Sequence, residues 1–238
     1  YSKGIRLNKI RVKEEDLEKI ENCLSLIGEI ELICGLFCSP NEVIFSTDRL
    51  QSPVTGLLVC GKFTQNCTFT QLRQFECKGR TTSSQSIASI LRSNPNLQVV
   101  TLRDANVLND NVIDAFAEIG PNLLEFHLIG MIEKRDVGLL TLAGHLKRLK
   151  KLTFECEGGL TTERAIGAIA LIHASPELEE LKLSEHENED IILTAARACP
   201  RLKALSVSNT LFTAKMLAEL SQNCQQLVSS VGRWPDHY

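Results

Sequence analysis

The hexapeptide Leu97-Gln98-Val99-Val100-Thr101-Leu102 decides the fold, because its pattern returns along most of the chain. The pattern is a leucine, two residues of any kind, an apolar residue, one residue of any kind and a second apolar residue. Such a short period predicts an array of similar layers, each burying its apolar side against its neighbours. Copies begin at Leu72, Leu97, Leu123, Leu149, Leu178 and Leu202, with successive offsets of 25, 26, 26, 29 and 24 residues.

Each repeat reads as a short strand followed by a helix. In the repeat that begins at Leu97, Val100 and Leu102 alternate as in a strand, and Asn109 or Asp110 precedes a helical pattern as its N-cap. The other expected caps are Ser83 or Ser84, Thr161 or Thr162, and Thr213. The apolar helix positions are expected to be Val112, Ile113, Phe116 and Ala117; Val137, Leu140 and Leu142; Ala165, Ile166, Ile169 and Leu171; Ile191, Ile192 and Ala195; and Met216, Leu217 and Leu220.

Stacked layers of this kind bend, because a helix is wider than a strand. We therefore predict an α/β solenoid in the form of a horseshoe, with a parallel β-sheet inside and helices outside. The hydrophobic content of 43% is sufficient for a continuous core. Because aromatic residues make up only 5% of the chain, this core is expected to consist mainly of aliphatic side chains.

The repeat is fainter at both ends of the chain. Residues 1–71 are predicted to hold divergent N-terminal repeats, and residues 72–238 regular repeats with a C-terminal cap, all as one continuous solenoid. After Leu227 the apolar positions are occupied by Ser230 and Gly232, so the repeat is expected to end there. The divergent copies are matched by Leu7, Ile10 and Val12; Ile27, Ile30 and Leu32; and Val54, Leu57 and Val59.

The nine cysteines show no regular pairing pattern, and several occupy apolar positions of the repeat. Cys77, for example, stands where Leu102 stands in the next copy. Cysteine there acts as a small hydrophobic residue, which indicates reduced thiols and a cytoplasmic or nuclear location. Two readings remain open for Cys34, Cys38, Cys60 and Cys67, namely buried thiols or a four-thiolate zinc site, and we expect no metal.

The charge pattern excludes several classes of partner. The formal net charge is -3, with acidic and basic residues interspersed, so a broad basic field for nucleic acid is absent. No stretch approaches the roughly 20 apolar residues that cross a bilayer. We therefore expect no nucleic-acid or membrane partner.

Two segments carry a family resemblance: Ala198-Cys199-Pro200-Arg201-Leu202 and Asn223-Cys224-Gln225-Gln226-Leu227. In both, a cysteine ends one helix and stands three residues before the leucine of the next strand. With this joint, the chain resembles the leucine-rich repeat superfamily in its ribonuclease inhibitor-like class, and is most similar to the repeats of F-box leucine-rich repeat proteins. The resemblance implies a substrate-recognition or scaffold part of a larger assembly such as a ubiquitin ligase.

Strand alternation predicts which side chains face the concave side of the sheet. Val99, Leu124 and Ile129 are apolar residues on an otherwise polar surface, with Arg103 and His127 beside them, as at protein interfaces. The alternative interpretation is an ordinary solvated sheet face. The predicted partner-binding residues are Gln98, Val99, Thr101, Arg103, Leu124, Glu125, His127, Ile129, Lys150, Lys151, Thr153, Glu155 and Lys182.

Catalysis has little support in the sequence. The five histidines are dispersed, and neither a nucleophile elbow nor a phosphate-binding glycine loop is present. We therefore predict a non-enzymatic module that binds another protein, without a cofactor, as part of a multi-subunit complex. Two alternatives are a sensor that binds a small anion or modified peptide through Lys150, Lys151, Lys182 and Lys203, and a structural subunit that docks through residues 1–70.

Overall fold

The computed structural model describes residues 4–8, 29–33, 56–60, 72–78, 83–103, 108–131, 137–156, 162–183 and 189–233. The chain divides into two compact units, residues 1–122 and residues 123–238, and each is described by itself. The predicted division at residue 71 stays a prediction, since most of residues 1–71 lie outside the described ranges. The sequence also predicts a helix over residues 14–20, and these residues lie outside the described ranges.

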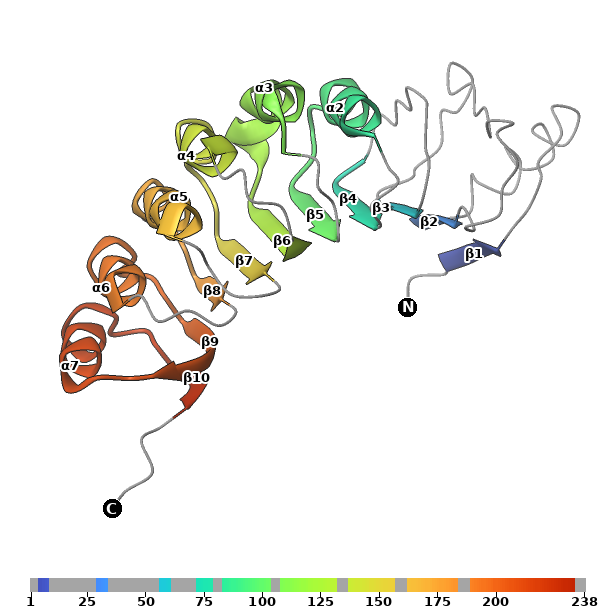
Figure 1. Ribbon diagram of the computed structural model, residues 1–238. Coiled ribbons are helices and arrows are strands. Elements are labelled where there is room, and N and C mark those ends of the chain that lie inside the picture. The colour runs from blue at the N-terminus through green and yellow to red at the C-terminus, as the bar shows by residue number, and fades with distance from the viewer. Residues whose placement is uncertain are drawn as a thin grey trace, which may run out of the picture. The chain divides into compact units, whose positions relative to one another are not determined.

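The described part of the first unit consists of parallel strands in chain order, followed from the fourth strand on by helices (Figure 1). The apolar positions of these strands share one register, which runs from Ile30 through Leu57 and Phe75 to Val100. The strands are β1 (Gly4–Asn8), β2 (Glu29–Ile33), β3 (Gly56–Cys60), β4 (Gln74–Lys78) and β5 (Val99–Arg103). The helices are α2 (Ser84–Ser93), α3 (Asp110–Ile119) and the 3-10 turn η2 (Gly120–Asn122).

The register corrects the predicted position of the first repeat. Ile5 and Leu7 pair with Ile30 and Leu32, in the positions that the sequence pattern assigned to Ile10 and Val12. Residues 5 to 12 hold two alternating apolar sets, and hydrogen-bonded pairing with β2 selects the earlier one. The first spacing, from Ile5 to Ile30, is therefore 25 residues rather than 20, close to that of the later repeats.

The second unit repeats one strand and one helix in regular alternation, with the helices on one side of the parallel strands (Figure 1). This confirms the predicted α/β class. The strands are β6 (Glu125–Met131), β7 (Lys151–Cys156), β8 (Glu180–Leu183), β9 (Ala204–Leu211) and β10 (Ser229–Arg233). The helices are α4 (Val137–Ala143), α5 (Thr162–His173), α6 (Glu189–Ala198) and α7 (Ala214–Asn223), and no helix among the described residues is long and apolar enough to span a membrane.

Three predicted helix caps are confirmed. Ser83, Asn109 and Thr213 precede α2, α3 and α7 in extended conformation, and each side chain accepts a hydrogen bond from the backbone N–H three residues later. Each cap satisfies a backbone donor that the first turn of a helix leaves without a partner. Thr161 lies outside the described residues.

The two apolar positions of each strand pattern form two rows through the core of the second unit. Every side chain in these rows is at most 1% exposed. Strand register places them side by side, so each layer covers the next. The rows are Phe126, Leu152, Leu181 and Leu205, and Leu128, Phe154, Leu183 and Val207.

Two residues predicted for the helix core are exposed instead. Leu140 in α4 is 53% exposed and Ile166 in α5 is 52% exposed. Leu139 is buried in place of Leu140. It packs against Gly167 so closely that a Cβ added to the glycine would lie 2.5 Å from the Cβ of Leu139. Helical periodicity did not distinguish these positions because both helices are apolar on more than one side.

The joint before each strand leucine uses polar atoms to connect successive layers. The Cys199 thiol donates to the carbonyl oxygens of Ile172 and Ser175 at 3.6 and 3.5 Å. The Cys224 thiol repeats this with Ala196 and Cys199 at 3.6 and 3.7 Å. Ile172 and Ala196 lie in the last turns of α5 and α6, so each thiol adds a donor near a helix C-terminus and connects it to the next layer. As predicted, Cys77, Cys199 and Cys224 are buried and reduced.

The chain after Leu227 still forms a strand, β10, although the sequence pattern predicts that the repeat ends there. Ser229, Ser230 and Val231 of β10 pair in parallel with Ala204, Leu205 and Ser206 of β9, followed by a shift in register. Backbone hydrogen bonds do not require an apolar side chain at residue 230, so the pairing outlasts the sequence pattern.

Candidate functional site

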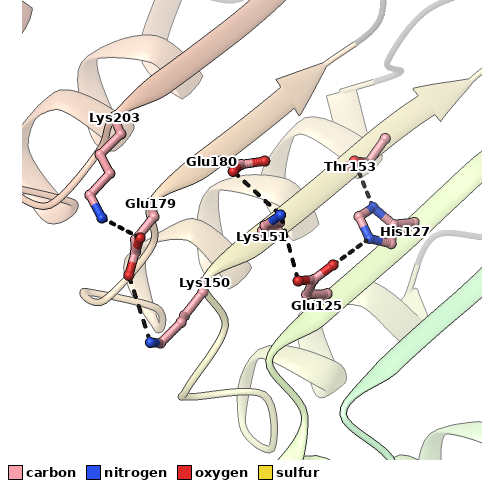
Figure 2. A network of polar contacts seen from close by, with 8 residues as sticks. All are labelled: Glu125, His127, Lys150, Lys151, Thr153, Glu179, Glu180 and Lys203. Carbon is pink, nitrogen blue, oxygen red and sulfur yellow. Dashed lines mark hydrogen bonds and ion pairs between the residues drawn. The ribbon is translucent and has the colours of Figure 1, made fainter. Parts of the chain in front are cut away.

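The side of β6–β8 opposite the core carries most of the charged residues predicted for the site. We call this surface, with the residues just before β6, β7, β8 and β9, the polar face. It gathers residues from successive layers that share a position in the repeat (Figure 2). The polar face consists of Leu124, Glu125, His127, Ile129, Lys150, Lys151, Thr153, Glu155, Glu179, Glu180, Lys182 and Lys203.

One row of the polar face alternates in charge from acid to base to acid. Lys151 lies in register between Glu125 and Glu180, with its Nζ 3.6 Å from Glu125 Oε1 and 3.4 Å from Glu180 Oε1 (Figure 2). The charge of Glu125 is the main reason that the pKa of Lys151 is raised; burial opposes it, and the charge of Glu180 adds to it. This ammonium group therefore stays charged and bridges three strands.

A second row, one residue earlier, alternates in the opposite sense. Glu179 lies between Lys150, at 3.7 Å, and Lys203, at 2.5 Å (Figure 2). The hydrogen bond from Lys203 is the main reason that the pKa of Glu179 is lowered. The backbone of the same residues is held equally closely, because the Glu179 carbonyl accepts from the N–H groups of both Lys203 and Ala204.

The histidine of the polar face lies between a hydroxyl and a carboxylate. His127 Nδ1 and Thr153 Oγ1 share a hydrogen bond of 2.8 Å, and His127 Nε2 is 3.6 Å from Glu125 Oε2. The order resembles a catalytic triad, but Thr153 is only 8% exposed and β7 is paired on both sides. The backbone N–H groups of β7 are therefore used in sheet pairing and are not available to stabilise an oxyanion. This geometry favours a structural role for Glu125, His127 and Thr153.

The lysines considered for anion binding are all engaged with glutamates. Lys150, Lys151 and Lys203 belong to the two rows above, and Lys182 Nζ is 2.6 Å from Glu155 Oε1. An anionic ligand would have to displace a carboxylate at each of them. This arrangement does not favour the anion-sensor hypothesis. The four lysines and the glutamates 125, 155, 179 and 180 give a surface without net charge.

The apolar residues predicted for the site are not all in one unit. Leu124 and Ile129 are half-buried at β6, and Ile129 is in register with Glu155. Val99 is half-buried in β5 of the first unit. The second unit therefore has two apolar residues beside its charged rows.

The remaining predicted residues lie on or beside β5. Gln98 is exposed and immediately precedes the strand, whereas Thr101 is only 8% exposed and offers little surface to a partner. The Arg103 guanidinium donates to Glu76 Oε1 at 2.5 Å, so opposite charges also pair in the first unit.

The pairing of the charges was not predicted, although the sequence contains its signal. Glu125, Lys151 and Glu180 all stand two residues after the repeat leucine, and opposite charges at equivalent positions of adjacent layers are cross-strand neighbours. Among the described residues, no group of histidine, cysteine or acidic side chains is arranged to hold a metal ion. Cys34, Cys38 and Cys67 lie outside those residues, as do the side-chain contacts of Cys60. No family model matches the chain, and no curated protein matches it either.

Proposed function

We propose that the chain is a non-enzymatic protein-binding module, built as a leucine-rich repeat solenoid of the ribonuclease inhibitor-like class. In this proposal the sheet of the horseshoe receives another protein. The single observation that carries it is the polar face, where side chains from three successive strands are fixed by ion pairs before any partner arrives. A surface ordered in advance loses little conformational entropy on binding.

The proposed role is substrate recognition or scaffolding within a larger assembly such as a ubiquitin ligase, as the similarity to F-box leucine-rich repeat proteins suggests. The buried reduced thiols of Cys199 and Cys224 support a cytoplasmic or nuclear location, because oxidising compartments favour disulfides. No cofactor, nucleic acid or membrane is part of the proposal.

The neutrality of the polar face gives the proposal a kinetic consequence. Long-range steering requires a net field, and four lysines balance four glutamates here. Specificity would then come from matching individual charges around Leu124 and Ile129. We expect the association rate of the partner to change little with ionic strength.

Affinity capture from native extract, with quantification of bound proteins, tests the proposal. Leu124→Glu and Lys151→Glu are expected to abolish capture of the partner while leaving the melting temperature nearly unchanged. Lys215→Glu is the matched control, because Lys215 lies on α7 and forms a comparable ion pair with Glu189 at 3.5 Å. Equal capture by all of these variants would place the partner elsewhere and contradict the proposed site.

A further inference from the structure

We draw no further inference here: the strongest candidate, the surface patch of α4 and α5 that exposes the apolar side chains of Leu140 and Ile166, carries none, because nothing among the described residues shows what covers it.

Discussion

Thr153 and Phe154 are neighbours in β7, yet they belong to surfaces that are stabilised in different ways. Phe154 is fully buried in a row of apolar side chains, whereas Thr153 lies on the polar face and bonds to His127. The buried side of the sheet depends on filled volume, and the polar face depends on pairs of charges and hydrogen bonds. The buried side gains its stability from many weak van der Waals contacts that add up. The polar face gains its stability from a few ion pairs and hydrogen bonds, which solvent weakens.

The largest expected effect tests this comparison within one strand. Phe154→Ala should lower the free energy of unfolding by about 3–5 kcal/mol, because it leaves a cavity between layers. Thr153→Ala should lower it by only about 1 kcal/mol, the net value of one hydrogen bond. Urea denaturation of both variants measures the difference. Equal losses would show that the two sides do not differ as described.

The buried side also includes the contact between α4 and α5. Gly167→Ala should destabilise the protein by about 1–3 kcal/mol, because its Cβ would lie 2.5 Å from that of Leu139. In an exposed helix position the same change stabilises by about 1 kcal/mol, so the sign of the effect is informative. Thermal unfolding of the variant checks it, and a higher melting temperature would mean that the helices are less closely packed.

The thiol joint contributes a pH dependence of the buried side. Burial, with a smaller effect of Cys224, raises the pKa of Cys199 from 9.0 to about 12, so the folded protein favours the neutral thiol. The contribution of the Cys199 thiol to the free energy of unfolding is fully present below about pH 9. It is lost as the pH rises toward 12, by about 1.4 kcal/mol per pH unit. Cys199→Ala should make the loss of stability between pH 9 and 10 less steep, and an unchanged slope would contradict the assignment.

The smallest effect is expected on the polar face. The hydrogen bond from Lys203 lowers the pKa of Glu179, so its contribution to stability is present above about pH 4.5 and is lost as pH falls further. Glu179→Gln should therefore be slightly less stable than the wild type at neutral pH, and the two should converge in acid. Denaturation at several pH values measures this, with Glu177→Gln as the control. A gap that persists in acid would mean that charge is not the cause.

Much of the fold could be predicted from residues that recur at fixed spacing. The apolar strand positions, such as Phe126 and Leu152, and the caps Asn109 and Thr213 follow from local rules that each repeat obeys separately. The exposure of Leu140 and Ile166 could not be predicted, because it depends on which side of α4 meets Gly167. A helical pattern that is apolar on several sides carries no information about that contact.

For the polar face, too, the sequence predicted which residues share the surface but not which of their side chains make contact. Strand alternation was enough to place Glu125, His127 and Lys151 on one surface, because side chains alternate with a period of two. The bridging of Glu179 by two lysines and the near burial of Thr153 depend on register between layers and on the reach of neighbouring side chains.

The sequence by itself therefore determined the unit of this protein: a strand, a helix and the joint between them, with the side of each strand that is buried. These features are local, since hydrophobic period and capping act within about 25 residues. Only the tertiary structure decided which charges pair, which apolar helix residues remain in solvent and where the first repeat begins. Each of these is a contact between different layers, and its energy depends on a neighbour that the local sequence does not contain.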